Sequence, residues 1–119
     1  MDHTVYISLG SNLGDRSANL ASAKDLLAKR CGRVTGVSSV YRSAPHEYVS
    51  ENEYFNQCIC LQTVLEPLPL MEQMLSIESE IGRIRDRRGY EDRLIDLDML
   101  LYDALVMQAE GHILEHGKA

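Results

Sequence analysis

The order of the predicted strands and helices is the feature that most constrains this fold. Patterns of apolar residues predict four strands, over Thr4–Gly10, Arg33–Arg42, Tyr54–Val64 and Leu94–Tyr102. Apolar residues at helical spacing predict one helix over about Arg16–Arg30 and a second from Pro67 through Ile81. The order β-α-β-β-α-β is that of a ferredoxin-like α+β domain, an antiparallel sheet with both helices packed on one face.

The remaining segments are expected to connect these elements. Tyr54–Val64 has apolar residues on both faces, which favours an interior position in the sheet. Ser43–Glu53 and the arginine-rich stretch Gly82–Arg93 are polar and aperiodic, so both are predicted to be loops. Ala104–Met107 is expected to be a short edge strand or a hairpin arm.

Composition narrows the class of protein. A chain of 119 residues is expected to form a single domain over 1–119. Its formal charge of −6 argues against nucleic-acid binding. There is neither a membrane-length apolar run nor a leader pattern, so we expect a cytoplasmic protein without a membrane partner. Cys31, Cys58 and Cys60 lack metal or disulfide spacing and are predicted to be buried, reduced thiols.

Two acids interrupt the last long strand. Asp96 and Asp98 would share one face of the strand, about 7 Å apart. The opposite face would direct four apolar residues into the core, namely Ile95, Leu97, Met99 and Leu101. A carboxylate pair flanked by apolar residues suits Mg²⁺, which prefers hard oxygen ligands and bridges to phosphates. The alternative is two exposed acids on the wet side of the sheet.

An arginine run directly precedes this strand in a chain that is acidic overall. It comprises Arg83, Arg85, Arg87, Arg88 and Arg93. Guanidinium groups hold phosphate through paired, charge-assisted hydrogen bonds. A solvated face partly neutralised by neighbouring acids is the alternative. Beside the diacid, however, the run favours a site for Mg²⁺ and a nucleoside triphosphate.

Two weaker motifs lie upstream. The turn Gly10–Gly14 between a strand and a helix could offer backbone N–H groups to an anion, or could simply begin the helix. In Tyr54-Phe55-Asn56, the first and third residues share a strand face. An aromatic ring beside a carboxamide could stack on a flat heterocycle and hydrogen-bond to it, although a tripeptide of this kind is more often structural.

Together these segments resemble the 6-hydroxymethyl-7,8-dihydropterin pyrophosphokinases of folate biosynthesis. The resemblance covers nearly the whole chain and is carried by Gly10–Asp15, Val37–Pro45, Tyr54-Phe55-Asn56, Ile77-Glu78 with Gly82–Arg85, and Arg93 with Asp96-Leu97-Asp98. It implies an ATP-dependent diphosphokinase that transfers pyrophosphate from ATP to the pterin hydroxymethyl group and releases AMP.

The resemblance also implies roles for individual residues. Asp96 and Asp98 would hold two Mg²⁺ ions, and Arg83 and Arg93 would contact the phosphates as catalytic residues. Arg85, Glu78 and His116 would assist in binding ATP. Tyr54 would stack on the pterin and Asn56 would read its edge, and that recognition would be completed by Ser43, Ala44 and Pro45.

The family continues beyond the position that matches Ala119, through a second pterin-stacking aromatic residue and a final helix. Without that segment we expect weak or absent turnover and an exposed surface suited to self-association. The alternative from another functional class is a catalytically inactive module of the same fold that binds nucleotide or pterin. In both cases the expected partners are small molecules.

Overall fold

The two helices and the long strands follow the predicted order, and several short strands are added to them. The computed structural model describes residues 2–43, 53–85, 91–107 and 113–115. Its elements are β1 (His3–Ser11), α1 (Arg16–Arg30), β2 (Arg33–Val37), β3 (Tyr41–Ser43), β4 (Tyr54–Thr63), α2 (Pro67–Ile81), β5 (Arg83–Arg85), β6 (Glu91–Arg93), β7 (Asp96–Tyr102), β8 (Leu105–Met107) and β9 (Ile113–Glu115). Within these ranges, neither helix has the length and apolar character that a membrane crossing requires.

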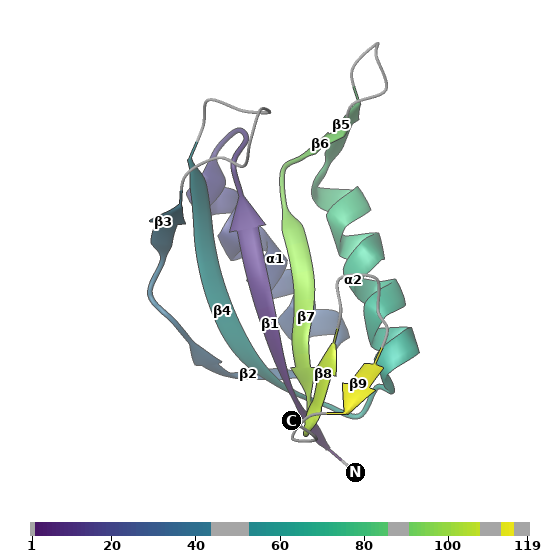
Figure 1. Cartoon of the computed structure of the whole chain (residues 1–119). Coiled ribbons are helices and arrows are strands. Elements are labelled where there is room, and N and C mark those ends of the chain that lie inside the picture. Colours follow the sequence, from purple (N-terminus) through teal and green to yellow (C-terminus); the bar gives the residue numbers. More distant parts are fainter. Residues whose placement is uncertain (1, 44–52, 86–90, 108–112, 116–119) are drawn as a thin grey trace.

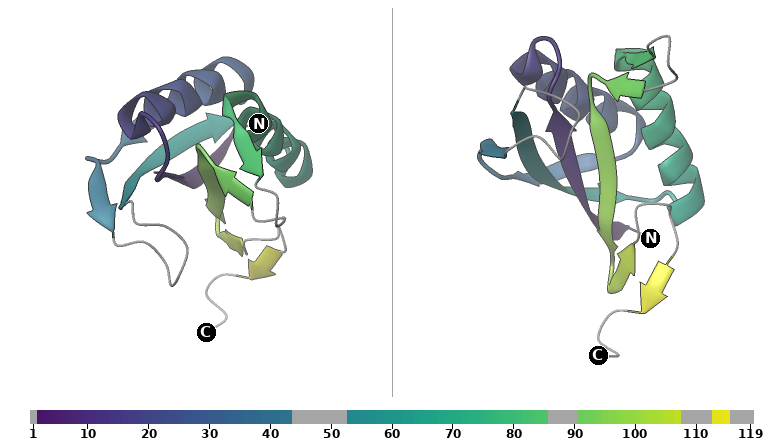
Figure 2. Two further views of the ribbon diagram at one scale, coloured as in Figure 1. Left: turned by 90° about the horizontal axis from the view of Figure 1, so that it is seen from above. Right: turned by 45° about the horizontal axis from the view of Figure 1, so that its top comes forward.

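One antiparallel sheet forms the body of the molecule. Its strands follow the order β2-β4-β1-β7-β8-β9, and β3 pairs with β4 beside β2. Both helices cover the same face of this sheet (Figures 1 and 2). The α+β, ferredoxin-like prediction is therefore confirmed, and β4 has the interior position that its apolar pattern indicated.

The core lies between the helices and the sheet. Buried apolar residues of both helices pack against buried apolar residues of the sheet. The helices contribute Leu20, Ala23 and Leu27 of α1 and Leu70, Met74 and Ile77 of α2. The sheet side contributes Val5, Ile7, Leu9, Ile59, Leu61, Ile95, Leu97 and Met99. The start of α1 is fixed by Asp15, whose carboxylate accepts a hydrogen bond from the Ala18 N–H at 3.0 Å. Pro67 begins α2, where its missing N–H costs nothing.

Three sequence predictions need correction. The first concerns Arg33–Arg42, which forms two strands because Ser38 interrupts the ladder. The Ser38 N–H donates to the Cys58 carbonyl at 2.8 Å, and the Ser38 Oγ accepts from the Cys58 N–H at 2.9 Å. A side chain thus replaces one backbone partner, and the strand resumes at Tyr41.

The second concerns Leu101, which was expected in the core. The register of β7 against β1 shifts between Tyr6 and Ile7, whose partners are Leu101 and Met99. Leu100 is therefore an extra residue in β7, and beyond it the positions that face the core change from odd to even numbers. As a result Tyr102 is buried and Leu101 is only partly buried.

The third concerns Gly82–Arg93, which was predicted to be a loop but in which β5 and β6 form a two-stranded sheet.

The cysteines follow the prediction in part. All three thiols are free, but Cys31 is buried whereas Cys58 and Cys60 are partly exposed. Burial raises the pKa of the Cys31 thiol.

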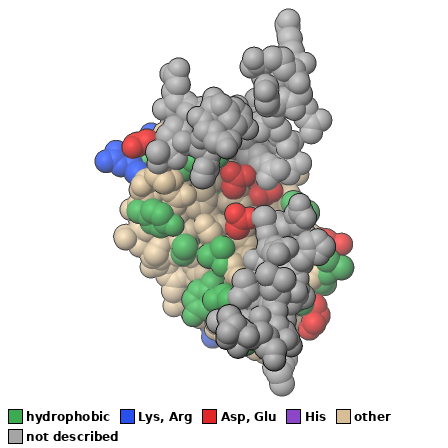
Figure 3. Space-filling view, viewed as in Figure 1, with side chains coloured by type: hydrophobic (Ala, Val, Ile, Leu, Met, Phe, Trp, Pro, Cys, Tyr) green, Lys and Arg blue, Asp and Glu red, His purple; other side chains and the backbone are tan. Residues whose placement is uncertain are grey.

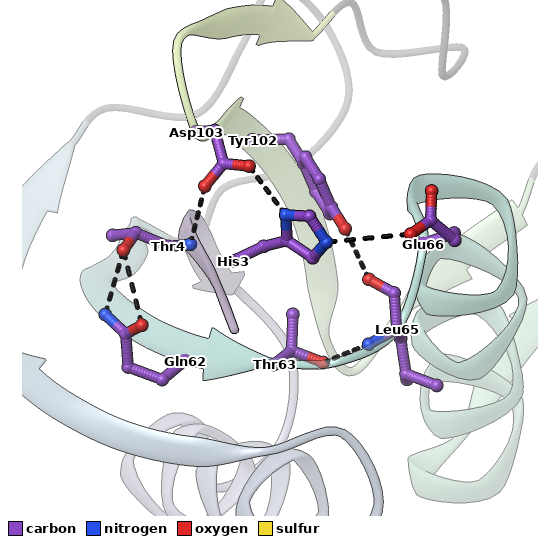
Figure 4. A network of polar contacts seen from close by, with 8 residues as sticks. All are labelled: His3, Thr4, Gln62, Thr63, Leu65, Glu66, Tyr102 and Asp103. Atoms are coloured by element: carbon purple, nitrogen blue, oxygen red, sulfur yellow. Dashed lines mark hydrogen bonds and ion pairs between the residues drawn. The ribbon is translucent and has the colours of Figure 1, made fainter. Parts of the chain in front are cut away.

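A polar network joins the beginning of β1 to the end of β7 (Figure 4). His3 Nδ1 lies 2.7 Å from Asp103 Oδ2, and His3 Nε2 lies 3.6 Å from Glu66 Oε2. The Thr4 N–H donates to Asp103 Oδ1 at 2.9 Å, and the Tyr102 hydroxyl donates to the Leu65 carbonyl at 2.5 Å. The network therefore holds the first residues of β1 in place, at the end of the strand away from Gly10 and Ser11.

Candidate active site

The face of the sheet that the helices leave open carries the predicted site. Along β1, Gly10 pairs with Asp96 of β7 on one side and with Asn56 of β4 on the other. Ser8 pairs in the same way with Asp98 and Cys58. Neighbouring strands lie about 4.8 Å apart, so the backbones of Asp96 and Asn56 are separated by about 10 Å. The two motifs, 40 residues apart in sequence numbering, thus meet across one strand.

Asp96 and Asp98 form the acidic side of this face. Asp98 is exposed and Asp96 is partly exposed, whereas Leu97 between them is buried. Acidic side chains are visible in the middle of the open face (Figure 3). The alternation predicted for this part of β7 is confirmed, because Ile95, Leu97 and Met99 all point into the core.

The two carboxylates fit Mg²⁺ as a partial ligand set. Among the described residues, no three His, Cys, Asp or Glu side chains gather closely enough to hold a metal ion. Mg²⁺ usually keeps several waters and takes one or two carboxylates plus substrate phosphates. Asp96 and Asp98 could provide the carboxylates, and a phosphorylated ligand would provide the rest of the coordination sphere.

Tyr54 and Asn56 form the opposite side of the site. Both are partly buried, and both border the backbone of Gly10. Asn56 Nδ2 donates to Ser43 Oγ at 2.9 Å, which joins two residues predicted to bind the same ligand. Tyr41 of β3 pairs with Asn56 of β4, and the pKa of Tyr41 is raised by its electrostatic interaction with Cys58 first and by burial second.

The beginning of β4 is held by α1. The Arg16 guanidinium carbon lies 4.1 Å from the centre of the Phe55 ring, and Arg16 Nη1 donates to the Glu53 carbonyl at 2.7 Å. Phe55 separates Tyr54 from Asn56, so Arg16 fixes the backbone that presents both side chains. Sequence reasoning missed this residue, although a cation at the first position of a helix is unfavourable and is therefore a signal in itself.

The arginine segment adjoins the acidic side. In the two-stranded sheet of β5 and β6, Arg83 pairs with Arg93 and Arg85 pairs with Glu91. The Leu94 N–H donates to the Gly82 carbonyl at 3.2 Å and closes the base of this hairpin.

Ser11 connects the Gly10–Gly14 turn to the same base. Its buried hydroxyl donates to the Leu94 carbonyl at 2.5 Å and accepts from Asn19 Nδ2 at 3.1 Å. Asn19 Nδ2 also donates to the Leu13 carbonyl at 2.9 Å. The turn therefore links α1 and β1 to Leu94, at the base of the β5–β6 hairpin, through hydrogen bonds. The sequence did not indicate this structural role.

Glu78 lies beneath the site rather than on its open face. Its side chain is 3% exposed, and Oε2 accepts a hydrogen bond from the Leu97 N–H at 2.7 Å. The remaining predicted residues, Ala44, Pro45 and His116, lie outside the described residues. For Arg83, Arg85 and Arg93 the structure describes the course of the backbone.

Comparisons with known proteins point to one family. The family model of 7,8-dihydro-6-hydroxymethylpterin-pyrophosphokinase matches residues 6–116. A 2-amino-4-hydroxy-6-hydroxymethyldihydropteridine pyrophosphokinase of Methylorubrum extorquens is 39% identical over 113 residues, which are 94% of this chain and 71% of that protein. The Bacillus subtilis protein of the same name is 38% identical over 117 residues, 98% of this chain and 70% of that protein.

A solved structure is similar in fold. It is described as HPPK-DHPS in complex with substrates, and it matches with a TM-score of 0.63 at 13% identity. The match covers 86% of this chain but 28% of that one, so it supports the fold alone. Because the family model matches residues 6–116 of this chain and a relative is 39% identical over 94% of it, the chain belongs to the 7,8-dihydro-6-hydroxymethylpterin-pyrophosphokinase family.

Proposed function

We propose that this chain transfers pyrophosphate from ATP to 6-hydroxymethyl-7,8-dihydropterin in folate biosynthesis, acting in the cytoplasm on small molecules. The observation that carries the proposal is the row Asp96, Gly10 and Asn56, which sets a carboxylate pair and a ring-binding pair on either side of one strand. Membership of the pyrophosphokinase family supplies the reaction.

In this reaction the pterin hydroxymethyl oxygen attacks the β-phosphorus of ATP. A new oxygen–phosphorus bond forms there, and the bond between the β-phosphorus and the oxygen that bridges to the α-phosphate breaks. AMP leaves with that oxygen, the hydroxyl proton is released, and the β- and γ-phosphates remain together on the pterin. Catalysis of this kind depends on positioning and charge neutralisation.

The residues divide these tasks. Asp96 and Asp98 would hold two Mg²⁺ ions, which neutralise phosphate charge when they are bound. Arg83 and Arg93 contact the phosphates with help from Arg85, and His116 contacts ATP. Tyr54 stacks on the pterin, Asn56 accepts a hydrogen bond from its edge, and the segment from Ser43 to Pro45 completes the contact. Glu78 acts through the backbone of β7, because its carboxylate is buried against Leu97.

The first test is AMP formation from ATP, Mg²⁺ and 6-hydroxymethyl-7,8-dihydropterin. Asp96→Ala should reduce the rate at least about a hundredfold, since metal ligation is worth several kcal/mol in such reactions. Asp25→Ala is the matched control, because Asp25 is an exposed helical acid paired with Lys29. Binding of both substrates without AMP formation would identify an inactive binding module instead, and no binding of either would contradict the proposal.

A further inference from the structure

Two cysteines lie next to each other on the open face of the sheet and have no part in the proposed reaction. Cys58 and Cys60 alternate along β4 with Ile59 and Leu61, which are buried in the core. Both thiols therefore point away from the core, and both are free and partly exposed. A pair of accessible thiols on one face of one strand is a set of potential metal ligands.

The spacing of the two thiols disfavours a disulfide and suits a bridging ion. β4 pairs with β1 without a register shift, so Cys58 and Cys60 have Cα atoms about 6.8 Å apart. A disulfide requires Cβ atoms about 3.8 Å apart, which would bend the strand. A linear sulfur–metal–sulfur bridge spans roughly 4.6 Å, twice a metal–thiolate bond of about 2.3 Å. Side chains that lean along the strand can provide that separation.

The surroundings of the pair leave room for an ion. Cys60 pairs with Gly36 of β2, and among the described residues a Cβ built at Gly36 would meet Cys60 Cβ alone, at 3.6 Å. The flank of Cys60 towards β2 is therefore open. The side chains of Tyr41 and Cys58 interact through a hydrogen bond. A hydrogen bond of this kind holds a metal ligand in a fixed orientation.

The number of ligands determines which ion fits. Thiolates select soft metals, chiefly Cu⁺, Zn²⁺ and iron–sulfur clusters. Zn²⁺ and iron–sulfur clusters take three or four protein ligands, and in the part of the chain that the structure describes no three His, Cys, Asp or Glu side chains gather closely enough. Cu⁺ is satisfied by two thiolates in a line. The carboxylates of Asp96 and Asp98 are hard ligands and do not compete for it.

We propose that Cys58 and Cys60 form a binding site for the soft monovalent cation Cu⁺. Each thiol releases its proton, and each sulfur donates a lone pair to the ion, so two protons leave for every ion bound. The oxidation states of sulfur and copper do not change. The site does not depend on the proposed function, and it lies across β1 from Asp98, because Ser8 pairs with Cys58 on one side and with Asp98 on the other.

Competition for Cu⁺ tests the proposal. The protein is titrated without oxygen into the coloured complex of Cu⁺ with bicinchoninate, and the loss of colour gives the stoichiometry and the Kd. Cys58→Ser and Cys60→Ser each remove one ligand at a partly exposed position and nearly keep the size of the side chain. Cys31→Ala is the matched control, because it removes the buried third thiol. Asp96→Ala is a second control, directed at the predicted magnesium site.

The expected result is one Cu⁺ per chain, with a Kd raised at least about a hundredfold in each serine variant. Cys31→Ala and Asp96→Ala should bind as the parent protein does. An unchanged Kd in either serine variant would overturn the proposal. Half an ion per chain would indicate bridging between two copies and would overturn it as well, as would loss of binding in Asp96→Ala.

A measurement on the parent protein alone supports the same decision. Bound Cu⁺ should protect Cys58 and Cys60 together from alkylation by iodoacetamide, which peptide mass spectrometry locates. Alkylation of either thiol at the rate of the metal-free protein would overturn the proposal. The proposed function is unaffected by that outcome, because AMP formation requires neither thiol.

Discussion

The carboxylate of Glu78 accepts a hydrogen bond from the backbone N–H of Leu97, the residue between Asp96 and Asp98. Glu78 belongs to α2, and although Leu97 is the register partner of Leu9 on β1, its N–H donates to Glu78. Among the described residues, β8 pairs with β7 only at Leu101 and Tyr102. The buried carboxylate thus takes the place of a neighbouring strand at the point where β7 presents its two acids.

Replacing Glu78 should therefore affect both folding and the metal site. Glu78→Ala removes the acceptor of a buried N–H, which should lower the free energy of unfolding by about 2 kcal/mol. Glu78→Gln keeps an oxygen at the same distance and should lose much less. Urea denaturation measures both variants, and Glu72→Ala, which removes an exposed carboxylate from the same helix, is the control.

The same variants separate positioning from simple stability. The Mg²⁺ concentration that gives half-maximal AMP formation should rise in Glu78→Ala and recover in Glu78→Gln, because Leu97 fixes the backbone of both aspartates. A Mg²⁺ dependence identical to the parent protein in Glu78→Ala would show that Glu78 only stabilises the fold.

Arg16 should influence pterin binding through Phe55. Arg16→Ala removes the cation over the ring and the hydrogen bond to Glu53, which should cost about 1 kcal/mol of stability. Because Phe55 lies between Tyr54 and Asn56, the pterin KM should rise more than the ATP KM. Arg33→Ala, at an exposed position on β2, is the control and should change neither. A pterin KM in Arg16→Ala equal to that of the parent protein would show that Arg16 does not influence the residues that bind the pterin ring.

Asp103 should make stability depend on acid pH. The Thr4 N–H first, and His3 second, hold the pKa of this carboxyl below its ordinary value of 3.8. A lowered folded pKa means that the stabilisation is complete above 3.8 and is lost as the pH falls through the folded value.

Asp103→Asn tests this contribution. Asparagine tolerates the φ of 54° and retains an oxygen for Thr4, but it removes the charge. The variant should be less stable at pH 7 by at most about 1 kcal/mol, because the pair is partly exposed. The difference in the free energy of unfolding between parent and variant, measured with urea, should become smaller below pH 4. A difference that stays constant from pH 7 to pH 3 would contradict the assignment.

Much of the fold was predictable because its signals are local. Asp15 and Pro67 mark helix starts, and the alternation of Ile95, Leu97 and Met99 gave the correct core face of β7. The misplacement of Leu101 arose from a register shift against Tyr6, which depends on a partner nearly 100 positions away. No local pattern could reveal it.

The site was predictable in its residue types but not in its supports. The pairing of Asp96 and Asn56 with Gly10 depends on sheet order, which periodicity alone does not determine. Glu78 carried a usable signal, since it lies four residues after Met74 on the buried stripe of α2, where a charged residue needs a specific partner.

Tyr102 should make stability depend on alkaline pH. Burial first, and the charges of Glu66 and Asp103 second, raise its pKa from the ordinary 10 to about 12. A raised folded pKa favours the neutral phenol, so its stabilisation is complete below pH 10 and is lost as the pH rises towards 12. Tyr102→Phe removes both this dependence and the hydrogen bond to the Leu65 carbonyl, at a cost of about 1 kcal/mol near neutral pH. The difference in the free energy of unfolding between parent and variant, measured with urea, should become smaller from pH 8 to pH 10 and pH 11. Tyr6→Phe, on an exposed tyrosine of the open sheet face, should show no such narrowing, and the same trend in both variants would remove Tyr102 as the cause.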